Sequence, residues 1–417
     1  MKKLFLFVAL FGVLNIGCTD MLDEWKDFVD GDTNTIIANN EIWYTNGSAK
    51  VKTNISNEQA FNVGIVSNKY SKRNNCWVIK FDGELKSIGE LAFKDSNLKS
   101  VTIPSGVTSV ESGAFANCRS LSEFNSEFAS DDGRCLIVDG RLVAFAPAGV
   151  AEYTISEDVT EIGDLVFSSC NYLSRVTCPN SVISIGESAF AYCANLTHIA
   201  FSNKLATIGS GAFSNCHSLI EVMLPYSVDY IGDFAFSDCS AISSLTIPNG
   251  VISIGNRAFL FCNSLTEVNI PDSVTTLGSS IFEGCGQLKS VTLGKGITAI
   301  PKYAFYKCDK LESVILGDRV TIIGELAFNC CLNLTTITLP ESVTTIGVRA
   351  FGACLNLVRV YCKAITPPIL VMSDDGCDVF TDNMMERLIY VPYESVQAYK
   401  SADGWMDYSD AIVGYNF

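Results

Sequence analysis

Residues 258–278 read AFLFCNSLTEVNIPDSVTTLG, and nearly the same frame recurs along most of the 417-residue chain. The phenylalanine of this frame returns every 23 residues from Phe167 to Phe351. Phe93 and Phe115 extend the series upstream, with intervals of 22 and 52 residues to the next member. A fixed period of this length is typical of a solenoid, in which each unit buries its apolar side chains against its neighbours.

The spacing inside one unit predicts its structure. Val268 and Ile270 alternate as in a short strand with one buried side. Pro271 lacks an N–H group and ends that strand, and the apolar residues that follow cover the opposite wall. Gly278 is expected to begin a short helical turn, because Pro301 takes the same position in another unit and fixes a negative φ. We therefore predict an α/β repeat solenoid with a parallel β-sheet on one face, and short helical turns and strands on the other.

The residues outside the repeat predict an export sequence, an insertion and two β-rich caps. We expect the chain to be divided into a signal peptide at 1–18, a tether at 19–40, an N-terminal cap at 41–85, the first repeats at 86–125, a hairpin insertion at 126–152, the main solenoid at 153–362 and a C-terminal cap at 363–417. Caps are expected at both ends because an open stack exposes unpaired strand edges.

Two dipeptides in these segments are typical of hairpin turns. Asp139-Gly140 lies between two apolar runs and predicts a hairpin that either projects from the solenoid or merely extends a sheet. Asn46-Gly47 predicts a second hairpin, between residues 41–45 and 48–53. Near the other end, the repeat dissolves at residues 366–368, after which 388–391 predicts a strand and 393–400 a short helix.

The N-terminus reads as a targeting sequence. Lys2-Lys3 precedes an apolar run at residues 4–16, which is too short to span a bilayer. The run ends in a stretch that resembles a bacterial lipobox, in which Cys18 would be acylated, although Asn15 stands where that pattern usually has Leu. We expect an exported protein attached to the outer membrane or cell surface through a lipid on Cys18. The alternative is a plain cleaved signal peptide in which Cys18 is incidental.

The net charge of the chain limits the classes of partner that it can bind. It has 45 acidic and 29 basic residues, which gives a net charge of −16. This balance excludes nucleic acid, because phosphate binding needs a basic surface, and it disfavours anionic membranes. A basic protein surface, a cation or an uncharged glycan meets no such repulsion.

The cysteines follow the repeat. Ten of the 17 lie three residues after a repeat phenylalanine, namely Cys118, Cys170, Cys193, Cys216, Cys239, Cys262, Cys285, Cys308, Cys331 and Cys354. Two others, Cys178 and Cys362, replace the last inward residue of a strand. We expect these twelve to be buried core residues, since a free cysteine behaves as a small hydrophobic side chain. One column of thiols without histidine partners does not predict a zinc site.

The sequence contains little that would support a catalytic function. The chain has only two histidines, His198 and His217, and neither lies in a known catalytic motif. Nucleotide-binding, zinc-protease and serine-hydrolase motifs are missing too. We predict no catalytic residue, no metal and no cofactor, while a glycosidase carboxylate pair among the many acidic residues stays open.

The outward side chains of the predicted sheet are where a ligand is expected. Their most varied stretch, and our candidate binding site, consists of His198, Glu221, Met223, Glu267 and Asn269. The alternative is that outward positions, many of which are Ser or Thr, simply suit exposed strands.

The frame Ile-Gly-x-x-Ala-Phe-x-x-Cys-x-x-Leu-x-x-Val-x-Ile-Pro resembles that of BspA-like leucine-rich-repeat surface proteins of gut and oral bacteria, over residues 86–362. The resemblance implies a leucine-rich-repeat solenoid and adhesion to extracellular protein, and it offers no catalytic residues to transfer. We expect a monomeric cell-surface protein that binds a host or bacterial protein. A carbohydrate-capturing lipoprotein is less favoured because Tyr361 is the only aromatic residue among the outward strand positions of the repeats. An enzyme and a structural envelope protein are the remaining alternatives.

Overall fold

The computed structural model describes residues 37–48, 55–373, 378–384 and 386–417. Residues 39–417 form one compact unit, separate from residues 1–38. The expected signal peptide, Cys18 and most of the expected tether therefore lie outside the described residues. In the part that is described, no helix has the length and apolar character needed to cross a membrane.

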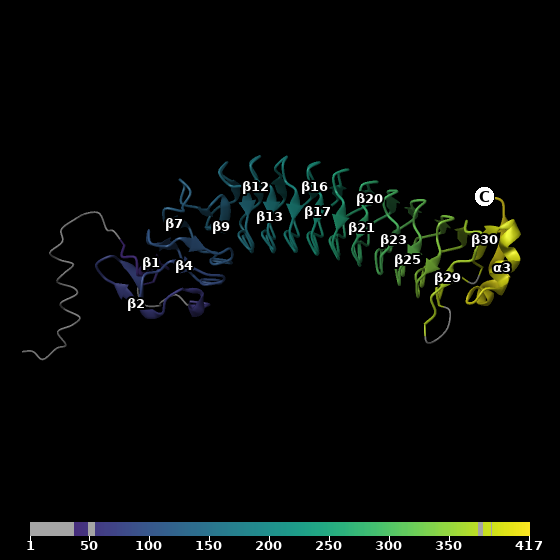
Figure 1. Ribbon diagram of the computed structural model, residues 1–417, viewed down its shortest axis with the longest axis horizontal. Coiled ribbons are helices and arrows are strands. Elements are labelled where there is room, and N and C mark those ends of the chain that lie inside the picture. Colours follow the sequence, from purple (N-terminus) through teal and green to yellow (C-terminus); the bar gives the residue numbers. More distant parts are fainter. Residues whose placement is uncertain (1–36, 49–54, 374–377, 385) are drawn as a thin grey trace, which may run out of the picture. The chain divides into compact units, whose positions relative to one another are not determined.

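Two ladders of short parallel strands, each divided into several hydrogen-bonded sheets, run along the stacked coils (Figure 1). The first ladder contains β5 (Ser100–Thr102), β7 (Glu123–Asn125), β10 (Glu152–Thr154), β12 (Arg175–Thr177), β14 (His198–Ala200), β16 (Glu221–Met223), β18 (Ser244–Thr246), β20 (Glu267–Ile270), β22 (Ser290–Leu293), β24 (Ser313–Ile315), β26 (Thr336–Leu339), β28 (Arg359–Cys362), β30 (Leu388–Pro392) and β31 (Ile412–Tyr415). The second contains β4 (Ser87–Ile88), β6 (Ser109–Val110), β9 (Arg141–Phe145), β11 (Glu161–Ile162), β13 (Ser184–Ile185), β15 (Thr207–Ile208), β17 (Tyr230–Ile231), β19 (Ser253–Ile254), β21 (Thr276–Leu277), β23 (Ala299–Ile300), β25 (Ile322–Ile323), β27 (Thr345–Ile346) and β29 (Ile369–Leu370).

The register of both ladders confirms the predicted solenoid. In the first ladder Val268 pairs with Val291, and in the second Ile162 pairs with Ile185, so equivalent residues of successive coils lie side by side. The repeat phenylalanines stack in one buried column, with ring centroids 4.7–5.7 Å apart from Phe167 to Phe351. Each coil thus buries its apolar side chains only against its two neighbours, as a repeat protein requires.

The segment around each phenylalanine differs from the expected helical turn. It is a run of turns in which two residues per coil, for example Ser280 and Gly284, have positive φ angles of 57° and 71°. Phe282 donates its N–H to the carbonyl oxygen of Ala304 in the next coil at 2.9 Å, so this N–H group bonds between coils instead of within a helix. Among the described residues the only α-helix is α3 (Val396–Ser401), which belongs to the C-terminal end.

The glycine that begins this segment has a steric role. Gly232 has no positive φ, in agreement with the proline found at this position elsewhere. A Cβ atom on Gly232 would lie 2.6 Å from the carbonyl carbon of Gly209 in the preceding coil. The glycine therefore permits close approach of neighbouring backbones.

The twelve cysteines predicted to lie in the core do lie there. All twelve are buried and free. Most donate a hydrogen bond from Sγ to the carbonyl oxygen of a phenylalanine in the preceding coil, as Cys239 does to Phe213 at 3.0 Å. Burial away from water raises the pKa of Cys193 and of Cys285 to about 12, so these thiols stay protonated near neutral pH.

The hairpin predicted by Asp139-Gly140 forms. β8 (Cys135–Val138) pairs antiparallel with β9, and the two turn residues have φ angles of 50° and 78°. β9 pairs in parallel with β11 on its other side, so the hairpin extends the second ladder of the solenoid and does not project from it.

This hairpin also divides the hydrophobic core in two. Leu136 and Val143 pack with the N-terminal cluster, whereas Leu142 and Phe145 pack with the cluster that continues through the solenoid. The ring of Phe145 lies 4.7 Å from that of Phe167 and so begins the long aromatic column. The insertion is thus a wall between two cores.

The second strand of the hairpin predicted at Asn46-Gly47 lies outside the described residues, apart from Ser48. β1 (Glu41–Thr45) pairs with β3 (Cys76–Phe81) on one edge and with β5 on the other. A hairpin of this region joins β2 (Ile65–Ser71) to β3, and a 3₁₀ helix, η1 (Glu58–Ala60), precedes it. Pairing with β5 makes the cap continuous with the first ladder.

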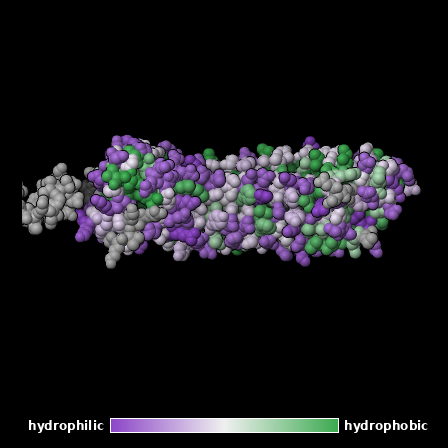
Figure 2. All heavy atoms as spheres, turned by 90° about the horizontal axis from the view of Figure 1, so that it is seen from below, coloured by the Kyte–Doolittle hydropathy of each residue, from purple (hydrophilic) through white to green (hydrophobic). Residues whose placement is uncertain are grey.

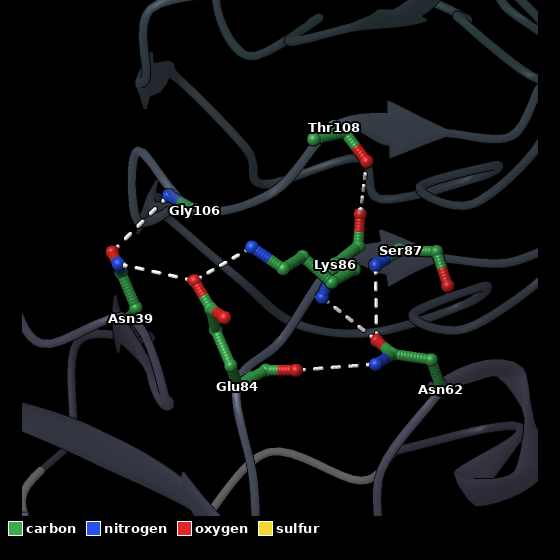
Figure 3. A network of polar contacts seen from close by, with 7 residues as sticks. All are labelled: Asn39, Asn62, Glu84, Lys86, Ser87, Gly106 and Thr108. Atoms are coloured by element: carbon green, nitrogen blue, oxygen red, sulfur yellow. Dashed lines mark hydrogen bonds and ion pairs between the residues drawn. The ribbon is translucent and has the colours of Figure 1, made fainter.

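Side-chain hydrogen bonds attach this cap to the first coils (Figure 3). The Oδ1 atom of Asn62 accepts the backbone N–H groups of Lys86 and Ser87 at 2.8 and 3.0 Å, and its Nδ2 donates to the carbonyl oxygen of Glu84. Asn39 accepts the N–H of Gly106 and donates to Glu84, which also forms an ion pair with Lys86. Two asparagines therefore satisfy the backbone groups that no neighbouring coil reaches.

The repeat continues further toward the C-terminus than its spacing indicates. Phe380 stacks on Phe351 with centroids 5.7 Å apart, and β29 adds one more rung to the second ladder. The strand and helix predicted near the end form as β30, η2 (Tyr393–Ser395) and α3. A further 3₁₀ helix, η3 (Trp405–Ala411), leads into β31, which pairs with β30.

Candidate functional site

The outward side of the first ladder carries the residues singled out from the sequence. All five are exposed: His198 on β14, Glu221 and Met223 on β16, and Glu267 and Asn269 on β20. Met223 exposes 65% of its surface, which is unusual for an apolar side chain. Glu221 and Glu267 lie two coils apart, roughly 10 Å at the usual strand spacing.

Most of these side chains have no internal partner. Within the part of the chain that the structure describes, the side chains of Glu221, Glu267 and Asn269 make no hydrogen bond or ion pair. The exception is His198, whose Nδ1 lies 2.9 Å from the hydroxyl of its neighbour Thr197. The row therefore offers two carboxylates, an amide and a thioether to solvent or to a ligand.

Sequence reasoning missed an aromatic group at the end of the same ladder. Tyr361 stacks on Tyr390 of β30 with centroids 4.7 Å apart, and Tyr415 and Phe417 meet these rings edge-on. The ammonium of Lys363 lies 5.9 Å from the ring of Phe417. Only the strand pairing reveals this group, because β30 and β31 fall outside the repeat.

A hollow of about 590 Å³ also lies beside the ladder, where β20, β22 and β24 run into the turns that follow them. It includes Asn269 of the predicted row. The signal in the sequence is the replacement of the usual proline by Gly294 and Gly317 in two successive coils.

The second ladder is a weaker candidate. Its exposed apolar residues, such as Ile183, Ile252 and Ile322, lie on or beside its strands. On the face seen in Figure 2, hydrophobic residues form separate patches among hydrophilic ones. Scattered apolar residues of this kind are normal for a protein surface.

The two histidines make separate hydrogen bonds. The ring of His217 contacts the carbonyl oxygen of Asp238 through Nδ1 at 2.9 Å, and His198 contacts only Thr197 among the hydrogen-bond partners in the described ranges. In those ranges no three histidine, cysteine or acidic side chains converge as metal ligands do.

Comparison with known proteins agrees with this architecture. A model of the "BspA type Leucine rich repeat region" matches residues 63–130, 142–252 and 230–358, in six copies. A leucine-rich repeat protein from Eubacterium ventriosum is 24% identical, with 72% of this chain and 81% of that chain covered and a TM-score of 0.50. One from Bacteroides ovatus is 23% identical, with 84% and 90% covered and a TM-score of 0.49.

A third structure, the pneumococcal vaccine antigen PcpA, is 21% identical, with 68% of this chain and 96% of that chain covered and a TM-score of 0.35. Among curated proteins the search finds no match. The family match covers well over half of the chain, and families of this kind are typically non-enzymatic and take part in protein interaction or adhesion. The chain therefore belongs to the BspA-type leucine-rich-repeat family.

Proposed function

We propose that the chain is a non-enzymatic adhesion protein that binds a host or bacterial protein on the outward side of the first ladder. The observation that carries this proposal is the row of exposed side chains without internal partners, above all Glu221, Met223 and Glu267. Two free carboxylates on a chain with a net charge of −16 favour a basic patch on the partner. Exposed Met223, on the same strand as Glu221, supplies an adaptable apolar contact.

The proposal extends to location and assembly. The lipobox-like sequence before Cys18 supports export and lipid attachment at the outer membrane or cell surface, with the protein acting as a monomer. A Cys18→Ala variant expressed in the native type of cell is expected to leave the membrane fraction. If the variant stays in the membrane fraction as the parent protein does, the proposed lipid anchor is wrong. Size-exclusion chromatography with light scattering tests whether the protein is a monomer in solution.

Binding of residues 39–417 to a panel of purified matrix proteins, mucins and surface proteins of other bacteria tests the function itself. We expect saturable binding to at least one protein, and a loss of about tenfold or more on Glu221→Lys with Glu267→Lys, since charges at the centre of an interface that become repulsive cost several kcal/mol.

The control carries the same change of charge on another side of the coils. Glu187 and Glu325 are exposed and each follows a repeat glycine, away from the first ladder. Glu187→Lys with Glu325→Lys is expected to leave binding within about twofold, since separated sites act independently. Equal losses in both double variants, or binding to no protein of the panel, would contradict the proposal.

A further inference from the structure

The hollow beside the first ladder has two walls and a floor that repeat from coil to coil. One wall is the outward row Asn269, Thr292 and Ile315. The other is the row Asp272, Lys295 and Asp318, which directly follow Pro271, Gly294 and Gly317. Three equivalent positions on each side therefore face the same space at the spacing of the coils.

Glycines open this space. In several coils proline follows the last inward residue of the strand, as at Pro248, Pro271 and Pro340, but here two successive coils have Gly294 and Gly317 at that position. A Cβ atom on Gly294 would lie 2.5 Å from the carbonyl oxygen of Pro271. The backbones of these coils therefore pack directly on each other, and no proline ring occupies the floor beside Lys295 and Asp318.

The polar groups of the walls are available to a ligand. Across the described ranges, the side chains of Thr292, Lys295 and Asp318 make no hydrogen bond or ion pair. Asp272 accepts the N–H of Lys295 through Oδ1 at 2.8 Å, which fixes its carboxylate at the rim. Ile315, 59% exposed, adds an apolar surface at one end.

We propose that this groove binds a linear, uncharged oligosaccharide that lies along the stack of coils. Sugar hydroxyls both donate and accept hydrogen bonds, so they match a wall that alternates carboxylate, ammonium and carboxylate. A pyranose unit is about as long as the spacing between coils, so a repeating ligand meets equivalent groups at each step. The apolar face of one sugar ring covers Ile315.

An extended peptide fits the groove less well. Peptides commonly add to an open strand edge, where main-chain hydrogen bonds supply affinity. β22 is paired with β20 on one side and with β24 on the other, so its edges are occupied. The net charge of −16 also disfavours acidic sugars.

This inference goes beyond the proposed adhesion to protein, because it assigns a second ligand class to a groove that shares only Asn269 with the candidate row. The test is titration of residues 39–417 with four neutral tetrasaccharides (cello-, malto-, xylo- and mannotetraose), followed by saturation-transfer NMR. Without an aromatic ring in the groove we expect a Kd of roughly 1 mM for at least one of them. Asp318→Ala is expected to weaken that binding about tenfold, since it removes a charged hydrogen-bond partner.

Matched variants separate the groove from general effects. Thr292→Trp fills the groove and is expected to abolish binding, whereas Thr246→Trp changes the same column outside the groove and leaves binding unchanged. Glu341→Ala, beside Pro340 in the column of Asp318, is the control for Asp318→Ala. Binding of none of the four sugars, or equal binding by both tryptophan variants, overturns the inference. Glu221 and Glu267 lie outside the groove, so loss of protein adhesion alone leaves it standing.

Discussion

The central coils at residues 153–362 and the N-terminal segment at residues 39–125 are stabilised in different ways. In the central coils the same core residues are repeated, so a phenylalanine column and a thiol column extend from coil to coil, beside a glycine column that only Pro301 interrupts. The N-terminal segment has a separate core and depends on single asparagines that appear once each. A defect in a column is therefore felt by neighbouring coils, whereas a defect in the cap stays local.

The largest expected effect comes from alkaline pH, which acts on the thiol column. Burial raises the pKa of Cys193 and Cys285 to about 12, whereas an unfolded thiol has a pKa near 8.5. Above pH 9 the unfolded chain releases these protons while the folded chain retains them, so stability falls by about 1.4 kcal/mol per pH unit for each such thiol.

Urea unfolding followed by circular dichroism at pH 8, 9, 10 and 10.5 measures this loss. Cys193→Ala removes one thiol and is expected to flatten the decline by about 1.4 kcal/mol per pH unit, although it lowers stability at pH 8. Parallel declines in the parent and in Cys193→Ala would show that other groups cause the alkaline unfolding.

The next largest effect is expected from a break in the aromatic column. Phe259 is fully buried between Phe236 and Phe282, with ring centroids 5.5 and 5.4 Å away. Phe259→Ala leaves a cavity and is expected to cost about 3–5 kcal/mol in the free energy of unfolding. Tyr226→Ala, at a residue that is 82% exposed, is expected to cost less than about 0.5 kcal/mol. Similar losses in the two variants would contradict the role of the column.

The central coils could be predicted from sequence because each repeat must bury the same apolar side chains at the same positions. Nine phenylalanines at one spacing fix the stack, and the strand register follows from it. The helical turn after the glycine was predicted wrongly, because one residue pattern fits both a helical turn and a run of turns bonded to the next coil. The choice depends on contacts between coils, which a single repeat does not contain.

The N-terminal cap and the candidate site were harder to predict for a related reason. β1 pairs with strands that lie about 35 and 57 residues away, and no local pattern in the sequence identifies partners at such distances. The exposed positions of His198, Glu221, Met223, Glu267 and Asn269 followed from alternation along the strands. The hollow did not, since it arises from two glycines in neighbouring coils acting together.

A smaller effect is expected at the glycine column. A Cβ atom on Gly232 would lie 2.6 Å from the carbonyl carbon of Gly209, so Gly232→Ala forces the two coils apart. We expect a cost of about 1–3 kcal/mol in urea unfolding, as for other overpacked sites. Gly286→Ala is the control, because its Cβ would meet only the carbonyl oxygen of Gly284, at 4.0 Å. A larger loss at Gly286 than at Gly232 would refute the close-approach argument.

The smallest effect is expected in the cap. Asn62→Ala removes the acceptor of the Lys86 and Ser87 N–H groups, which then bond to water, so we expect a cost of about 1 kcal/mol. Because the cap has its own core, amide hydrogen exchange should quicken at residues 86–88 while the central coils keep their protection. Asn263→Ala, at an exposed asparagine in the central coils that makes no side-chain hydrogen bond among the described residues, should change neither. Faster exchange throughout residues 153–362 of the Asn62 variant would instead mean that the hairpin wall couples the two cores.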